Sequence, residues 1–262
     1  MKTRIISALV AGVLLAGVLA LHKTIVFNIA LSLIAIIMVY ELFKCLKCDK
    51  EYVYMFSAMV FVATMPIMAY FEICLSVYLL VAFSAFAICS FMAICRHKTV
   101  DLEKYFLLTL ETLLVGASML SLAIVEKLQQ GLLLLILTFC GAWFSDTGAY
   151  FVGTLCGRNK LCPEISPKKT VEGLFGGLIT NAVLFPLYGL LLLKDTNVLF
   201  YIVVGLVCSV LGLIGDLMAS LIKRKYGIKD YGNIMPGHGG AMDRFDSILF
   251  VAPFMAIILN LF

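Results

Sequence analysis

Residues 198–215 read VLFYIVVGLVCSVLGLIG, an unbroken apolar run without a charged side chain. A helix needs about 20 mainly apolar residues to cross the roughly 30 Å hydrocarbon core of a bilayer. Together with its neighbours, residues 197–222, the run is long enough to do so. This stretch therefore predicts a membrane-spanning helix.

The same pattern recurs on both sides of that run. The 262 residues are 63% hydrophobic and 14% charged, with a mean hydropathy of +1.06, far above that of a soluble domain. The runs are continuously apolar, whereas barrel strands alternate apolar and polar residues. The sequence predicts an all-α, polytopic integral membrane helix bundle of about nine transmembrane helices, at residues 4–21, 25–43, 52–70, 73–95, 104–125, 131–152, 172–193, 197–222 and 246–262.

Basic residues indicate the orientation, because loops rich in Lys and Arg stay in the cytoplasm. With the N-terminus inside, seventeen of the 20 basic residues fall in cytoplasmic segments. Only Lys23, Lys127 and Lys194 fall outside. We expect a multi-pass protein of the plasma membrane whose two richest basic loops, residues 153–171 and 223–245, face the cytoplasm.

One membrane-embedded domain, residues 1–262, accounts for the pattern, with scaffold helices in 1–140 and catalytic helices and cytoplasmic loops in 141–262. The first apolar run follows Lys2 and Arg4 like a signal peptide, but the lack of a clean cleavage site favours a retained helix. Within the scaffold, Glu111 lies in mid-span, where a carboxylate is costly. It either has a function or pairs with a neighbouring helix, and both readings stay open.

The remaining composition argues against two other classes of site. The net charge of +4 comes from loops that flank the membrane, where orientation and anionic lipids explain it, so we expect no nucleic-acid partner. Nine cysteines, mostly inside apolar runs, do not form a disulfide framework. Cys45 and Cys48 form a lone CxxC without a second ligand pair, which predicts no zinc site.

Two acidic clusters lie at the cytoplasmic ends of predicted spans. In SDTGAYFVG, residues 145–153, helical spacing puts Asp146, Tyr150 and Gly153 on one face. In GDLMASLIKR, residues 215–224, the same spacing aligns Asp216 and Ser220 with Lys223. A buried acid needs a metal or a basic partner, and each cluster alone is equally compatible with an ordinary interfacial or paired carboxylate.

A third cluster, SPKKTVEG, occupies residues 166–173. Serine before proline resembles an N-cap followed by a first-turn proline, so we expect a helix to start at Ser166 and Pro167. Free backbone N–H groups and lysines at a helix start favour a phosphate ligand, although a plain basic loop next to the membrane has the same composition. Gly173 and Gly177 are expected to allow close helix packing.

The fourth cluster is the most informative. Glycines and Pro236 surround His238 in residues 229–241, called here the glycine-rich loop, whose backbone could approach a phosphate closely. Asp243 and Asp246 follow at a predicted helix start. Carboxylate oxygens suit magnesium better than zinc, and Asp216 could join this pair in a metal site.

These motifs resemble the CDP-diacylglycerol synthase (phosphatidate cytidylyltransferase) family. The family signature runs from Ser-x-x-Lys-Arg through Lys-Asp to Pro-Gly-His-Gly-Gly and Asp-Arg-x-Asp, and residues 220–246 match it nearly throughout. SDTGAYFVG and SPKKTVEG occur in the expected order upstream. The resemblance covers the C-terminal half, whereas the N-terminal spans share only hydropathy.

The resemblance implies that phosphatidic acid attacks the α-phosphate of CTP, releasing pyrophosphate and leaving CDP-diacylglycerol, with Mg²⁺ required. It implies catalytic roles for Asp216, Asp243 and Asp246, with His238 ranked below them because phosphatidate is already ionised. Asp146 could complete a metal shell with these three aspartates. The implied substrate-binding residues are Ser166, Lys168, Lys169, Thr170, Ser220, Lys223, Arg224, Lys229, Asp230, Gly239, Gly240 and Arg244.

Expected partners are CTP, phosphatidic acid and the lipid bilayer, with a homodimer kept open. The alternatives are CTP-dependent activation of another lipid phosphate, such as an ether lipid, and a transporter. A transporter is disfavoured because the charged clusters face one side and the two halves show no matching interrupted spans. A catalytically idle subunit should have lost charged motif residues, and all of them are present.

Overall fold

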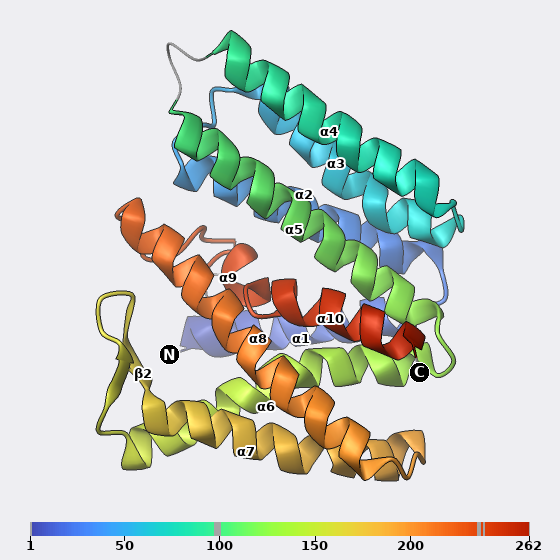
Figure 1. Ribbon diagram of the computed structural model, residues 1–262, viewed down its shortest axis with the longest axis vertical. Coiled ribbons are helices and arrows are strands. Elements are labelled where there is room, and N and C mark those ends of the chain that lie inside the picture. Colours follow the sequence, from blue (N-terminus) through green and yellow to red (C-terminus); the bar gives the residue numbers. More distant parts are fainter. Residues whose placement is uncertain (1, 97–100, 235–236, 238, 262) are drawn as a thin grey trace. The chain divides into compact units, whose positions relative to one another are not determined.

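Long apolar helices dominate the computed structural model (Figure 1), which describes residues 2–96, 101–234, 237 and 239–261. Seven described helices are long and apolar enough to cross a membrane. Helix α10 is apolar but shorter, with 14 residues. The predicted polytopic membrane helix bundle is confirmed, with seven such helices among the described residues where about nine were predicted. The helix at the predicted first span, residues 4–21, is not among the seven, and the predicted last span, residues 246–262, corresponds to the shorter α10.

The chain forms two compact units, each described here by itself. The first contains the residues up to 124 together with 228–244, and the second contains residues 125–227 and the chain from 245 onward. The prediction of one membrane-embedded domain stays a prediction. Helices of the first unit are α1 (Lys2–Ala20), α2 (Ile25–Cys45), α3 (Tyr52–Tyr70), α4 (Leu75–Cys95) and most of α5 (Leu102–Lys127).

Aromatic rings hold α2, α3 and α5 together in the first unit. The ring of Tyr54 stacks on Tyr105, with centroids 4.8 Å apart, and meets Phe43 edge-on at 5.0 Å. The hydroxyl group of Tyr54 lies 2.8 Å from that of Thr109, so its polar end is satisfied inside the bundle. Glu111 of α5 is buried, with 3% of its surface exposed.

The second unit contains α6 (Gly131–Cys156), the strands β1 (Lys160–Cys162) and β2 (Ser166–Thr170), α7 (Val171–Tyr188), the π-helical turn η1 (Gly189–Leu193), α8 (Val198–Lys225) and α10 (Ile248–Leu261). The short helix α9 (Met242–Phe245) crosses the boundary between the units. In Figure 1, α7 runs beside α6 and the hairpin stands at the start of α7.

Small residues let α6 and α7 approach closely. A Cβ atom on Gly177 would lie 2.7 Å from the hydroxyl oxygen of Ser145, and one on Gly173 would lie 2.9 Å from the carbonyl oxygen of Ala149. Both predicted packing glycines are therefore confirmed. The buried Asn181 adds a polar clasp, because its amide donates to the carbonyls of Gly141 at 2.9 Å and Gly205 at 3.0 Å.

The hairpin corrects the prediction of a helix start at Ser166 and Pro167. Strand β2 pairs antiparallel with β1, with Lys160 opposite Thr170 and Cys162 opposite Ser166. Helix α7 begins only at Val171, where the Thr170 hydroxyl accepts the Gly173 N–H at 3.1 Å. A threonine cap followed by an acidic first turn is a stronger start signal than Ser-Pro, and proline is tolerated in a two-stranded edge.

All nine cysteines are free thiols, as predicted, and Cys45 and Cys48 are buried.

Candidate active site

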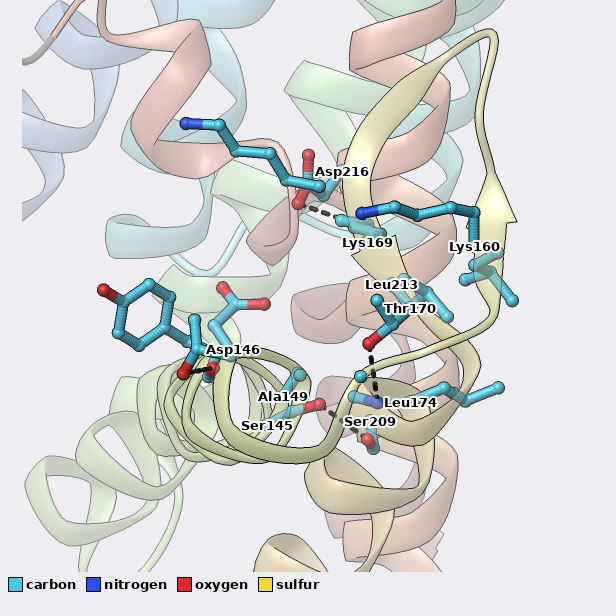
Figure 2. A pocket seen from close by; sticks show the side chains of 17 residues that line it. Ser145, Asp146, Ala149, Lys160, Lys169, Thr170, Leu174, Ser209, Leu213 and Asp216 are labelled. Carbon is cyan, nitrogen blue, oxygen red and sulfur yellow. Dashed lines mark hydrogen bonds and ion pairs between the residues drawn. The ribbon is translucent and has the colours of Figure 1, made fainter.

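A pocket of about 460 Å³ opens in the second unit among α6, the hairpin, α7 and α8 (Figure 2). Three of the four sequence clusters meet there, and helical spacing correctly placed Asp146, Tyr150 and Gly153 on its wall. Acidic, basic and hydroxyl side chains line it together. Its charged and hydroxyl-bearing residues are Ser145, Asp146, Tyr150, Thr154, Lys160, Lys168, Lys169, Thr170, Ser209 and Asp216.

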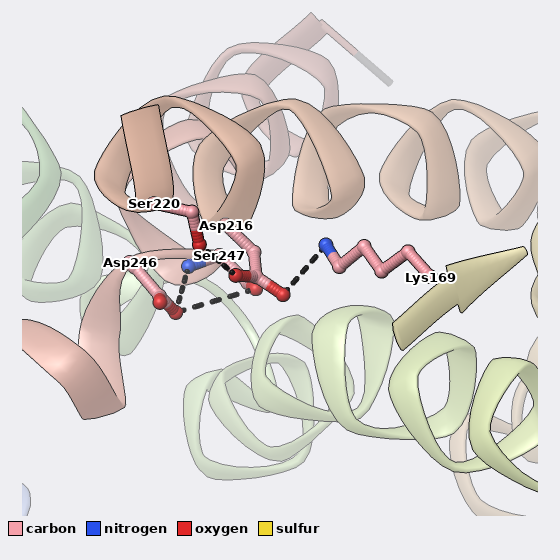
Figure 3. Close-up of polar contacts among 5 residues, drawn as sticks. All are labelled: Lys169, Asp216, Ser220, Asp246 and Ser247. Carbon is pink, nitrogen blue, oxygen red and sulfur yellow. Dashed lines mark hydrogen bonds and ion pairs between the residues drawn. The ribbon is translucent and has the colours of Figure 1, made fainter. Parts of the chain in front are cut away.

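An ion pair lies at the acidic side of this pocket. The ammonium nitrogen of Lys169 is 2.6 Å from a carboxylate oxygen of Asp216, and 21% and 28% of these side chains are exposed. The Ser220 hydroxyl donates to the other oxygen of Asp216 at 3.3 Å, which confirms that both residues share a helical face. Asp216 is thus held between a lysine from β2 and a serine one turn along α8 (Figure 3).

Asp246 lies close enough to Asp216 and Asp146 for their negative charges to act on it. Burial, and after it the negative charge of Asp216, raises the pKa of Asp246 to about 7, with a smaller contribution from Asp146. The Ser247 N–H at 2.7 Å and the charge of Lys223 oppose this rise. Three carboxylates from α6, α8 and the turn before α10 therefore repel one another, and a cation among them would relieve that repulsion.

The carboxylates of Asp146, Asp216 and Asp246 suit a hard cation that also keeps ligands from outside the protein, such as water or substrate phosphates. Within the described ranges, no group of three or more Asp, Glu, His or Cys side chains lies close enough together to hold a metal ion by itself. Magnesium is commonly held by one or two carboxylates together with substrate phosphates and water, so it does not require a full protein shell. Asp146, Asp216 and Asp246 offer the oxygen ligands that it prefers.

The hairpin presents three lysines to the pocket. Lys168 is exposed, Lys169 is half-buried, and Lys160 comes from the opposing strand. The carboxylate of Glu172 fixes the base of the hairpin, since it accepts the N–H groups of Arg158 and Asn159, each at 3.1 Å. A local network therefore holds these cations over the acidic wall.

Other predicted substrate residues of this unit have structural contacts. Thr170 is buried and caps α7, and Ser166 is half-buried in β2 outside the pocket lining. Lys223 is buried near Asp246, with 8% exposed. Arg224 is exposed and donates from Nε to the carbonyl of Ile165 at 3.3 Å, so it touches the hairpin turn.

The part of the fourth cluster up to Arg244 belongs to the first unit, whereas Asp246 belongs to the second. Asp243 accepts the N–H groups of Tyr231 at 2.8 Å and Gly240 at 3.0 Å, which folds the glycine-rich loop back on itself. Gly239 has a φ of +88°, where a side chain would be strained. Lys229, Asp230 and Arg244 are exposed, whereas His238 lies outside the described residues. The predicted four-aspartate metal set, which includes Asp243, stays a prediction.

Sequence reasoning missed three features. Lys160 lines the pocket, although its place in a basic loop was a usable signal. The hydroxyl oxygens of Ser145 and Ser209 lie 2.6 Å apart between α6 and α8. Glu41 of α2 is buried and accepts the N–H groups of Ala241 at 3.1 Å and Met242 at 2.9 Å. The only signal in the sequence for this buried role of Glu41 was the presence of an acidic residue near the end of an apolar span.

Comparison with known proteins identifies the family of this chain. Residues 2–262 match the cytidylyltransferase family. A phosphatidate cytidylyltransferase of Bacillus subtilis is 41% identical over 166 residues, which are 63% of this chain and 62% of that protein. One of Staphylococcus epidermidis is 44% identical over 135 residues and one of Staphylococcus aureus 45% identical over 136, each covering 51% of this chain and 52% of the relative. The chain thus spans between about half and 62% of the length of these relatives. Because the family match extends over residues 2–262, this chain belongs to the cytidylyltransferase family.

Proposed function

We propose that this chain is a phosphatidate cytidylyltransferase, which converts CTP and phosphatidate to CDP-diacylglycerol and pyrophosphate. The observation that carries the proposal is the pocket that Lys160, Lys168 and Lys169 line together with Asp146 and Asp216, in a member of this family. Its relatives named for this activity support the choice of substrates. The pocket belongs to a membrane helix bundle, which is compatible with a lipid substrate.

The reaction joins two anions, so it depends on positioning and on neutralising charge. An oxygen of the lipid phosphate bonds to the α-phosphorus of CTP, and the bond from that phosphorus to the bridging oxygen of the β-phosphate breaks. Pyrophosphate leaves with the electron pair. Phosphatidate is ionised near neutral pH, so no general base is needed, and His238 is not required as one.

We assign the hairpin lysines Lys160, Lys168 and Lys169 to the triphosphate of CTP, because all three line the pocket from the two strands of the hairpin. Asp146, Asp216 and Asp246 would hold Mg²⁺, which supplies positive charge to the phosphates when it is bound. Lys169 would then exchange its contact with Asp216 for a phosphate oxygen. Lys223 and Arg224, which belong to the same unit as the pocket, are left for the lipid phosphate, on the cytoplasmic side of the plasma membrane. The substrate-binding roles of Lys229 and Arg244 stay predictions.

The test is CTP-dependent product formation by the purified protein in detergent micelles with Mg²⁺ and phosphatidate. CDP-diacylglycerol and pyrophosphate should appear in equal amounts, and Asp243→Asn should reduce both. A parallel reaction with an ether lipid phosphate separates the proposed substrate from the alternative one. A folded wild-type protein that forms no product with phosphatidate would disprove the proposal.

A further inference from the structure

Glu41 is a buried acid that the proposed chemistry does not use. It lies in the last part of α2, in the unit that also contains residues 228–244, and 3% of its surface is exposed. A buried carboxylate without strong partners is costly, so its contacts should show why it is there. All the contacts described below lie within this unit.

Both oxygens of Glu41 accept backbone N–H groups from a segment two hundred residues away. Oε1 accepts Ala241 N–H at 3.1 Å, and Oε2 accepts Met242 N–H at 2.9 Å. These N–H groups precede and begin α9, where the first residues of a helix have no acceptor within the helix. Hydrogen bonds to a charged acceptor are about twice as strong as neutral ones. The carboxylate therefore ties the end of the glycine-rich loop to α2.

Two glycines of the loop leave room for this carboxylate. A Cβ atom on Gly232 or on Gly240 would overlap the side chain of Glu41. Neither glycine has a positive φ, unlike Gly237 and Gly239, so backbone conformation does not demand glycine at these two positions. Gly232 and Gly240 are explained by the space that Glu41 occupies.

The same turn is held from its other side by Asp243. Its Oδ2 accepts the N–H groups of Gly240 at 3.0 Å and Tyr231 at 2.8 Å. The consecutive N–H groups of residues 240, 241 and 242 thus point at two carboxylates, Asp243 for the first and Glu41 for the other two. Moving Glu41 would move the backbone that carries Asp243 and Arg244.

We propose that Glu41 is a positioning residue, whose carboxylate fixes the backbone at Ala241 and Met242 and thereby sets where Asp243 and Arg244 lie. Its effect on turnover rests on the proposed function, whereas its effect on the loop does not.

The first test uses amide hydrogen exchange on the purified full-length protein. Glu41→Gln keeps the size of the side chain but replaces one accepting oxygen by a donor, so Ala241 and Met242 cannot both be bonded. We expect the peptide containing residues 240–244 to exchange about 10- to 100-fold faster, because a bond to a charged group is lost. Glu111→Gln, which removes an equally buried carboxylate in α5, should leave that peptide unchanged.

A double-mutant cycle tests the link to the glycines. Gly240→Ala should reduce CDP-diacylglycerol formation in the wild type but cause little further loss in Glu41→Ala, because the overlapping carboxylate is gone. Glu41→Gln should also lower turnover more than Glu111→Gln, and the melting temperature of each variant checks that it is folded at the assay temperature.

The positioning role of Glu41 and the proposed cytidylyltransferase activity can be refuted separately. Equal exchange of residues 240–244 in Glu41→Gln and Glu111→Gln would overturn the positioning role, as would full additivity of Gly240→Ala and Glu41→Ala in an active enzyme. A wild type without cytidylyltransferase activity, but with loop exchange that depends on Glu41, would overturn the proposed function and leave the positioning role supported.

Discussion

Replacing Lys169 by methionine probes the charge balance of the pocket. The ammonium nitrogen of Lys169 lies 2.6 Å from Asp216, and less than a third of each side chain is exposed. At an effective dielectric constant of about 20, two unit charges at 2.6 Å attract by about 6 kcal/mol, most of which is offset by desolvation. In the proposed reaction Lys169 gives this contact to a phosphate of CTP, so its loss removes one charge-assisted contact, worth about 1.5–3 kcal/mol.

We therefore expect Lys169→Met to lower kcat/KM for CTP by about 10- to 100-fold. The assay follows CDP-diacylglycerol formation over a range of CTP concentrations at fixed phosphatidate and Mg²⁺. The matched control is Lys168→Met, which removes the exposed neighbouring lysine and should cost less than about fivefold, because water screens its charge. The melting temperature in detergent checks that both variants are folded.

Two results would refute this reasoning. One is a folded Lys169→Met enzyme whose kcat/KM for CTP stays within about twofold of the wild type. The other is a larger loss in Lys168→Met than in Lys169→Met, which would mean that the half-buried lysine serves Asp216 alone.

Three further changes test the scaffold of the pocket. Asn181→Ala should destabilise the protein by about 1–3 kcal/mol, seen as a lower melting temperature, because it removes the clasp between α6, α7 and α8. Gly176→Ala should cost about 1–3 kcal/mol by the same measurement, because its Cβ would lie 2.5 Å from that of Val152. Glu172→Gln should raise KM for CTP about threefold without lowering the melting temperature, since a carboxylate oxygen that accepts N–H groups at the base of the hairpin is lost.

Each of these changes has a matched control. Asn260→Ala removes an exposed asparagine whose hydrogen bond among the described residues goes to Ala256 in its own helix. A drop in melting temperature equal to that of Asn181→Ala would therefore contradict the bridging role of Asn181. Gly12→Ala, also inside a helix, meets nothing within 4 Å and should not lower the melting temperature. Glu164→Gln changes an exposed acid of the hairpin turn outside the pocket lining, and an effect on KM as large as that of Glu172→Gln would argue against a specific role for the Glu172 network.

Local periodicity made part of the site predictable. Asp146, Tyr150 and Gly153 share a wall of the pocket because residues spaced by one or two helical turns lie on one face. Asp216 and Ser220 share a face for the same reason, and their hydrogen bond confirms it. Apolar length likewise predicted the bundle, since the hydrocarbon thickness sets how long a span must be.

Contacts between distant segments were not predictable in this way. No spacing rule connects Glu41 with Ala241, because such a contact depends on how whole helices pack. The Ser-Pro pair at residues 166–167 led to the wrong prediction of a helix start where the structure has strand β2. The pair is compatible with both an edge strand and a helix start. The antiparallel partner of that strand carries Lys160, which periodicity could not bring to the pocket.

The rate of CDP-diacylglycerol formation by Asp216→Asn, measured beside the wild type and Asp195→Asn, tests both the proposed activity and its location. Asp195 is an exposed carboxylate of the same unit, before the start of α8, whereas Asp216 lies near the end of that helix in the pocket. Activity that is lost in Asp216→Asn and kept in Asp195→Asn, with both proteins folded, is the predicted result. Equal activity of the two variants, or no product from the folded wild type, would contradict it.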